Sequence, residues 1–207
     1  MLDVVYLIIF VVVPAIVLHE VAHGLSAYAL GDNTAKNQGR LTLNPIKHID
    51  PVGSIIVPGG LFLMHFFFPA QPLMLFGWAK PVPVNFRNLK PLRLGMALVA
   101  LSGPVTNILL AFIFSKLYIW PVLSGATNIC YYGVMLNLTL AVFNMMPIPP
   151  LDGSRVVTSI LPMKLAFYYS KLERYGIFIV MMFLYFGLFR FLSPIIEQVG
   201  YWIGVQI

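Results

Sequence analysis

Residues 4–30 read VVYLIIFVVVPAIVLHEVAHGLSAYAL, an apolar run of helical length that contains a glutamate between two histidines. About 20 apolar residues are enough to cross a bilayer as an α-helix. No basic segment precedes the run and no small-residue cleavage site follows it, so we expect a retained membrane helix rather than a secretory signal. Gly31 and Asp32 come next and are typical of a helix end.

The composition of the whole chain agrees with this interpretation. Of the 207 residues, 59% are hydrophobic and 10% are charged, and the mean hydropathy is +0.88. This apolar content exceeds what a water-soluble core of this size would bury. No linker, low-complexity tract or internal repeat divides the sequence. We therefore predict an all-α membrane protein, a polytopic helical bundle formed by one domain over residues 1–207.

Long uncharged stretches predict about five membrane spans and a short tail. The connection at residues 33–50 contains Asn44-Pro45, so we expect turns or short strands there. The expected spans lie at about residues 4–30, 51–80, 94–118, 128–146 and 175–191, and the tail at residues 193–207 is expected to be an interfacial helix with Tyr201 and Trp202 at headgroup level.

Residues 51–80 pose a counting problem, because basic connections flank one helix-length apolar segment on both sides. If both connections face the same side of the membrane, the chain must return. Either Pro58-Gly59-Gly60 breaks the segment, or an extended strand over residues 76–84 returns as a re-entrant β element, which we favour. Irregular backbone at membrane depth must border protein or a water-filled cavity.

The net charge of +6 reflects topology better than nucleic-acid binding, because the basic residues form no patch with exposed aromatic residues. They gather in three connections, at residues 36–47, 80–93 and 155–174. Placing these connections in the cytoplasm leaves only Lys116 and Arg190 on the other side, as the positive-inside rule predicts. We therefore expect a multi-pass protein of the cell membrane with its N-terminus outside.

His19, Glu20 and His23 form the pattern His-Glu-x-x-His. On a helix the two imidazoles stand about 40° apart around the axis and one turn apart along it, so both can bind one metal ion. Glu20 can reach a metal-bound water without being a ligand, as in zinc hydrolases. The pattern also arises by accident, but a glutamate near the bilayer centre costs at least about 2.5–3.5 kcal/mol and needs a partner, which a cation supplies.

A catalytic zinc ion needs a third protein ligand, and its fourth position is left for water. Asp152 is the strongest candidate, because it follows a long uncharged stretch and a proline-broken helix end on the same side as the two histidines. The other acidic residues lie at helix ends, in connections or on the far side. His48 and His65 remain alternatives, although a loop or packed histidine is the commoner role.

With these motifs the chain resembles the site-2 protease family of intramembrane zinc metalloproteases. The resemblance lies in His19–His23 and in Asn144–Gly153, which follows the family signature N-x-x-P-x-P-x-L-D-G. Ser102-Gly103-Pro104 with Asn107 is similar to the central core helix of the family, and residues 77–85 are similar to the re-entrant segment of its compact prokaryotic members. We find no PDZ or CBS module in the sequence, so regulation through such a domain is not expected.

This resemblance implies a cofactor and a role for each site residue. His19, His23 and Asp152 would bind one Zn²⁺, and Glu20 would be the catalytic general base and later the acid. Asn144 would hold the substrate strand or the developing oxyanion, unless its only role is a hydrogen bond that caps the broken helix. The substrates would be transmembrane proteins or peptides, cleaved in or near their membrane segments by a site that opens toward the cytoplasm.

Two other functions compete with proteolysis. A metal transporter or channel also places histidines and acidic residues inside the membrane, but its polar groups usually line a two-sided path, whereas here they concentrate toward one face. A catalytically silent metal-binding scaffold is the second, and Glu20 beside the expected ligands argues against it. The expected partners are the lipid bilayer and membrane-protein substrates, without nucleic acid, and the sequence predicts no oligomeric state.

Overall fold

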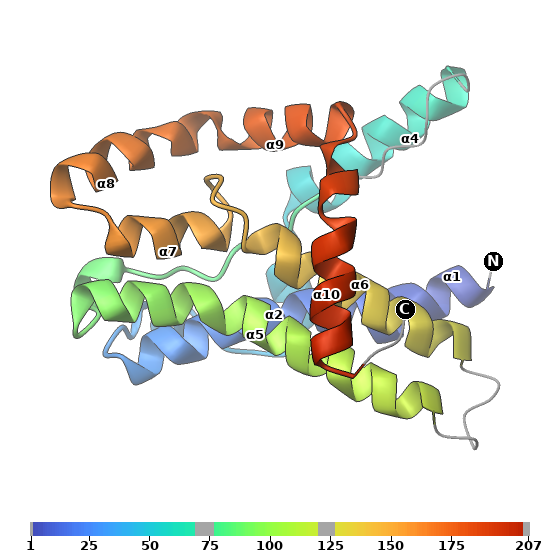
Figure 1. Ribbon diagram of the computed structural model, residues 1–207, viewed down its shortest axis with the longest axis horizontal. Coiled ribbons are helices and arrows are strands. Elements are labelled where there is room, and N and C mark those ends of the chain that lie inside the picture. The colour runs from blue at the N-terminus through green and yellow to red at the C-terminus, as the bar shows by residue number, and fades with distance from the viewer. Residues whose placement is uncertain (1, 69–76, 120–126, 205–207) are drawn as a thin grey trace.

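Figure 1 shows the computed structural model of the chain, which describes residues 2–68, 77–119 and 127–204. Within these ranges the chain is helical and contains no strand, as the all-α prediction required. The α-helices are α1 (Leu2–Leu7), α2 (Val13–Ala29), α3 (Thr34–Asn37), α4 (Val57–Phe67), α5 (Leu92–Ile119), α6 (Thr127–Asn144), α7 (Asp152–Ile160), α8 (Met163–Ser170), α9 (Gly176–Tyr185) and α10 (Ser193–Trp202). The π and 3₁₀ turns are η1 (Ile8–Val12), η2 (Pro45–His48), η3 (Pro51–Ile56), η4 (Phe86–Asn88), η6 (Lys171–Tyr175) and η7 (Leu188–Phe191).

The N-terminal helix is formed by α1, η1 and α2 without interruption. The π turn η1 lies just before Pro14, which has no N–H to donate to the preceding turn. The helix ends where the sequence predicted, because Gly31 takes the left-handed conformation with φ of 102°. The buried carboxylate of Asp32 then accepts hydrogen bonds from Thr34, Asn85 and Asn88 and fixes the exit of the chain.

Helix α5 packs against α2, α6 and α7 (Figure 1). Apolar residues of α5, α6 and α10 form a buried cluster that includes Ala111, Leu138 and Ile196. One face of α10 therefore packs on the core, while Tyr201 and Trp202 are exposed. The interfacial position of this helix stays a prediction. That prediction reached residue 207, and residues 205–207 lie outside the described part.

Two helical stretches of the described residues, Val5–Ala29 and Leu92–Tyr118, are long and apolar enough to cross a membrane. The prediction of five spans is therefore not confirmed. Among the expected spans, the fifth, at residues 175–191, differs most from the observed helix bounds. There α8, η6 and α9 form one helical run that already begins at Met163. It ends at Tyr185, shortly before Gly187, which takes a left-handed conformation with φ of 64°.

The segment before the second basic connection is one helical run, η3 and α4, and Pro58-Gly59-Gly60 does not break it. Pro58 cannot donate a hydrogen bond to the preceding turn, and the carbonyl of Gly53 instead accepts one from Trp78 N at 3.1 Å. Residues 77–85 have no regular secondary structure and form no β ladder with other described residues, so the re-entrant strand predicted at residues 76–84 is not confirmed. Phe76, which the predicted strand included, lies outside the described residues. The earlier connection at residues 33–50 forms turns and short helices instead of strands.

Candidate metal centre

Two imidazoles on α2 form one side of the candidate site. His19 and His23 stand one helical turn apart, and both are buried, with 8% and 9% of their surface exposed. Their Nε2 atoms lie 3.1 Å apart, and the rings meet edge to face with centroids 4.7 Å apart. The four-residue spacing therefore brings two potential ligand nitrogens to one point.

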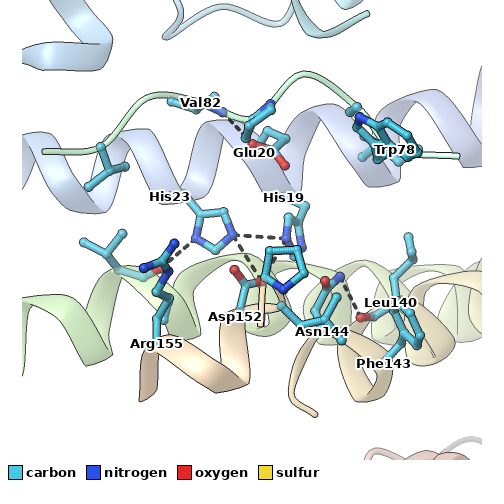
Figure 2. A pocket seen from close by; sticks show the side chains of 18 of the residues that line it. His19, Glu20, His23, Trp78, Val82, Leu140, Phe143, Asn144, Asp152 and Arg155 are labelled. Atoms are coloured by element: carbon cyan, nitrogen blue, oxygen red, sulfur yellow. Dashed lines mark hydrogen bonds and ion pairs between the residues drawn. The ribbon is translucent and has the colours of Figure 1, made fainter. Parts of the chain in front are cut away.

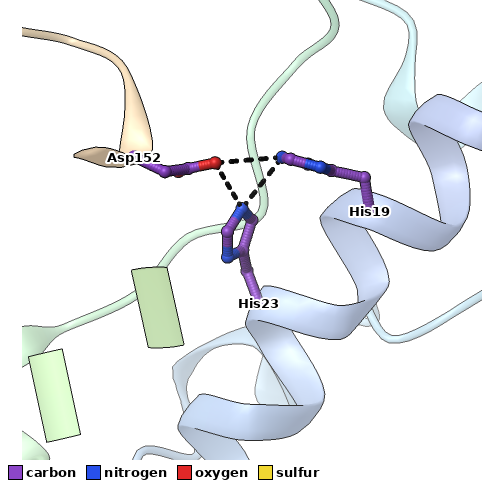
Figure 3. A group of neighbouring side chains, drawn as sticks. All are labelled: His19, His23 and Asp152. Atoms are coloured by element: carbon purple, nitrogen blue, oxygen red, sulfur yellow. Dashed lines mark hydrogen bonds and ion pairs between the residues drawn. The ribbon is translucent and has the colours of Figure 1, made fainter. Parts of the chain in front are cut away.

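Asp152 reaches the same point from the turn between α6 and α7 (Figure 3). Its Oδ2 lies 3.2 Å from His19 Nε2 and 3.3 Å from His23 Nε2. The prolines after Asn144 end α6, and α7 begins at Asp152 itself, so the break falls where the sequence predicted it. The turn is tight, because a Cβ on Gly153 would lie 2.2 Å from the carbonyl oxygen of Met145.

The protonation of the two imidazoles follows from their partners. His19 Nδ1 lies 2.5 Å from Asn107 Oδ1, and His23 Nδ1 lies 2.7 Å from the carbonyl oxygen of Val99. Both oxygens are acceptors, so each Nδ1 donates, and a neutral imidazole then presents a bare lone pair at Nε2. Among the described residues, Asp152 Oδ2 has no hydrogen-bond partner. With both rings neutral, three lone-pair atoms face one another, which is an arrangement that a bound cation satisfies.

This donor set fits a zinc ion. Ligand atoms about 2.0–2.2 Å from a tetrahedral zinc lie roughly 3.3–3.6 Å from one another, and the observed separations are 3.1, 3.2 and 3.3 Å. Two nitrogens and one carboxylate oxygen are common zinc ligands, and three protein ligands leave a position for water. His19, His23 and Asp152 are the group in the described part of the chain that could hold a metal.

Glu20 projects away from the three candidate ligands. Its Oε2 accepts a hydrogen bond of 2.8 Å from the backbone N–H of Val82, in segment 77–85 (Figure 2). The side chain is half-buried and lines the same pocket as the histidines. Glu20 thus lines the pocket that contains the candidate metal position without belonging to the ligand group.

A pocket of about 570 Å³ surrounds these groups. One wall is formed by α2, α5, the end of α6 and the α6–α7 turn, and the other by segment 77–85 and α9. Much of the lining is apolar, including Ile16, Val84, Leu140 and Phe143. Such a lining suits apolar peptide side chains, with the polar groups concentrated at the metal position.

Asn144 lines the pocket at the last residue of α6 (Figure 2). Its Nδ2 donates a hydrogen bond of 3.0 Å to the carbonyl oxygen of Leu140. The structure therefore contains the helix-end hydrogen bond considered from the sequence, and it also places the side chain within the pocket. His48, in contrast, is buried elsewhere and bonds to the carbonyl oxygen of Thr42, and neither His48 nor His65 joins the ligand group.

Several residues at the site were not predicted from the sequence. Asn137 is fully buried and bonds to Asn107, and an amide within an apolar helix was a signal that could have drawn attention to it. Arg155 lies one turn after Asp152, forms an ion pair with Glu173 at the rim of the pocket, and has its guanidinium 5.3 Å from the centre of the Phe86 ring. Its position three residues from Asp152 was the available signal.

Comparison with known proteins places the chain in a family. YwhC of Bacillus subtilis, which bears the name putative zinc metalloprotease, is 40% identical over 190 residues, covering 87% of this chain and 80% of the relative. The chain belongs to peptidase family M50. The model of that family matches residues 121–187 of this M50 peptidase, which include Asn144 and Asp152.

Other relatives match shorter parts of the M50 peptidase. Rip2 of Mycolicibacterium smegmatis is 30% identical over 146 residues, which are 66% of this chain and 50% of the relative. MJ0611 of Methanocaldococcus jannaschii is 43% identical over 63 residues, which are 28% of this chain and 31% of the relative. Both bear the same descriptive name as YwhC. No solved structure matches the M50 peptidase.

Proposed function

We propose that this M50 peptidase is an intramembrane zinc metalloprotease that hydrolyses peptide bonds in or near the transmembrane segments of other membrane proteins. Its membership of the family makes it a metallopeptidase. The observation that carries the proposal is the convergence of His19, His23 and Asp152 at a pocket beside α2 and α5. These helices belong to the two stretches of the described residues that are long and apolar enough to span a bilayer.

Each side chain has a proposed role in this reaction. His19, His23 and Asp152 would hold one Zn²⁺, which when bound acidifies water and polarises the scissile carbonyl. Glu20 would take the proton of the attacking water and later give it to the leaving nitrogen. The hydrogen bond from Val82 N limits rotation of the Glu20 carboxylate and keeps it at the pocket.

Asn144 is proposed to bind the substrate strand or the developing oxyanion. Its position in the pocket lining supports this role. Its amide nitrogen is engaged with Leu140 O, so the role requires the side chain to rotate or to use its oxygen toward a substrate N–H. The cleavage rate of Asn144→Leu decides between this role and that of a helix cap. A lower rate at unchanged zinc content supports substrate or oxyanion binding, and an unchanged rate supports the helix cap.

We propose a topology of about five crossings within one domain over residues 1–207, with the N-terminus outside, residues 77–85 re-entrant and the site open to the cytoplasm. The distribution of basic residues supports it. In a Cys130→Ser background, Lys36→Cys should resist an impermeant thiol reagent in intact cells and Lys116→Cys should react. The reverse pattern would invert the topology.

The direct test of the function is Glu20→Gln in proteoliposomes that contain a transmembrane reporter. We expect one zinc ion per chain to be retained and cleavage to fall by about 10²–10⁴-fold, the usual contribution of a general base. Glu197→Gln, on the exposed surface of α10, should cleave as the unaltered protein does. Unchanged cleavage by Glu20→Gln would remove Glu20 from the chemistry, and zinc flux without any cleavage would favour a transporter.

A further inference from the structure

One face of α5 matches the two histidines of α2 position by position. Val99, Gly103 and Asn107 are spaced four residues apart, so they lie on one side of α5. The carbonyl of Val99 bonds to His23, and the amide of Asn107 bonds to His19. A Cβ on Gly103 would lie 2.5 Å from His23 Nε2 and 2.6 Å from His19 Cε1, so the absence of a side chain lets both rings lie against α5.

The amide of Asn107 can be oriented in only one way. Its Nδ2 lies 2.9 Å from Asn137 Oδ1 and 3.3 Å from the carbonyl oxygen of Ala15. Asn137 Nδ2 in turn donates to the carbonyl oxygen of Gly133 at 2.8 Å. Because a carbonyl oxygen only accepts, every donor in this chain has a fixed direction, and the oxygen of Asn107 must face His19.

We propose that Asn107 is a positioning residue of the metal centre and that Asn137 holds it in place. The hydrogen bonds from Gly133 through Asn137 and Asn107 keep His19 as the Nδ1–H tautomer and turn its Nε2 lone pair toward His23 and Asp152. The inference rests on the proposed zinc site and adds to it the residues that prepare one ligand before metal binds. Hydrogen bonds of this kind to ligating histidines typically change metal affinity by 10–100-fold.

The two ligand histidines are prepared differently. His23 relies on a backbone carbonyl, which no side-chain substitution removes. His19 relies on two asparagine side chains, both with 0% of their surface exposed. Buried amides in an apolar bundle can also serve helix packing alone. Packing and positioning make different predictions, because packing needs only the volume of Asn107, whereas positioning needs an acceptor at its Oδ1.

The experiment measures zinc affinity of the full-length purified protein by competition with a chromogenic chelator, together with the d–d absorption of bound Co²⁺. Asn107→Leu, which has similar volume and no acceptor, should bind zinc 10–100-fold more weakly. Asn107→Asp keeps the acceptor that faces His19 but loses the donor to Asn137, so its zinc affinity should fall less than that of Asn107→Leu. Asn137→Leu should be weakened less than Asn107→Leu. Ser115→Ala, which alters another buried polar residue of α5 that bonds only to Phe112 O among the described residues, should have no effect.

Three outcomes would overturn the proposal. They are unchanged zinc affinity in folded Asn107→Leu, equal weakening by Asn107→Leu and Asn107→Asp, and weakening by Ser115→Ala of the same size. If Asn107→Leu does not fold, Asn137→Leu decides: ¹⁵N-histidine spectra of its metal-free form should show a mixed His19 tautomer, and an unmixed Nδ1–H form together with unchanged affinity overturns the proposal. If zinc affinity does not depend on Asn107, the loss of cleavage expected for Glu20→Gln is unaffected. The two proposals can therefore fail independently of each other.

Discussion

The two walls of the pocket are held by different kinds of bond. On the helical wall, the ligand histidines are buried and bonded to α5 through His19–Asn107 and His23–Val99. On the other wall, segment 77–85 is held through its own backbone. Its N–H groups donate to Gly53, His48, Glu20 and Asp32, and its carbonyl oxygens accept from Ser54 and Arg40. The metal position is thus fixed by ligand side chains bonded to a neighbouring helix, whereas the segment on the other wall is fixed by the hydrogen bonds of its own backbone.

Removal of a ligand from the helical wall should have the largest effect. His23→Ala takes away one of the three converging atoms, and we expect zinc content to fall from one ion per chain to nearly none and cleavage to reach background. Metal analysis of the purified protein measures this. His65→Ala, a matched change on α4, should keep its zinc, because His65 is outside the ligand group. Full zinc content in His23→Ala would show that the metal does not bind at the site formed by His19, His23 and Asp152.

Gly103→Ala tests how closely the rings depend on α5. The added methyl would overlap both imidazoles, so we expect a loss of about 1–3 kcal/mol in stability, as for other overpacked cores, and weaker zinc binding. The control is Gly59→Ala on α4, where a Cβ would meet no described atom within 4 Å. That change should be neutral or stabilise by up to about 1 kcal/mol. Thermal unfolding of both proteins in detergent provides the comparison, and equal effects would contradict it.

Asp32→Asn tests the connection between the two walls, because Asp32 joins the end of α2 to Asn85 and Asn88. Burial works against ionisation of Asp32, but the hydrogen bonds from Thr34, Asn88 and Asn85 outweigh it and hold its pKa below the ordinary value of 3.8. A lowered pKa in the folded state stabilises the protein above pH 3.8 and ceases to do so as the pH falls through the lowered value.

We therefore expect Asp32→Asn to lose about 1–3 kcal/mol at pH 7. The difference from the unaltered protein should shrink below about pH 3.8. Thermal unfolding measured across this pH range checks the expectation. A difference that stays constant down to pH 3 would mean that the charge of Asp32 is not what stabilises the connection.

Arg155→Gln should have the smallest effect. The Arg155–Glu173 pair lies at the rim, with side chains 28% and 42% exposed, and solvent-exposed pairs contribute no more than about 1 kcal/mol. We expect unchanged zinc content and a shift in stability within that limit. Glu173→Gln should act alike, and the double variant should show no further loss. A loss of zinc in Arg155→Gln would contradict this expectation and would mean that the ion pair at the rim helps to hold the metal position.

Features that depend on neighbouring residues could be predicted from the sequence. The spacing of His19 and His23 sets their relative position on any helix, and Gly31 ends α2 as glycine commonly does. The prolines before Asp152 predicted a broken helix in the same way. These local rules supplied the members of the candidate site, although their roles in catalysis remain predictions.

Features that depend on distant pairs or on helix length could not be predicted. Lys164 and Lys171 were interpreted as parts of a connection, because a count of charges does not separate a charged helix from a loop, and both lie in the helical run that begins at α8. Pro58 was a candidate break because the donor that serves the Gly53 carbonyl in its place, Trp78 N–H, lies 25 residues after Gly53 in the chain. His19 and Asn107 are 88 residues apart in sequence, and only the folded bundle brings them together.

The pairing of the bonded positions on α2 and α5, which are four residues apart on each helix, also depends on the register of the two helices. The two helices run in opposite directions, with Val99 opposite His23 and Asn107 opposite His19. A slide of one helical turn, about 5.4 Å, would bring Ala111 to His19 and leave that ring without an acceptor. Correct alignment of the helix pair and readiness to bind metal are therefore a single event in the assembly of this protein.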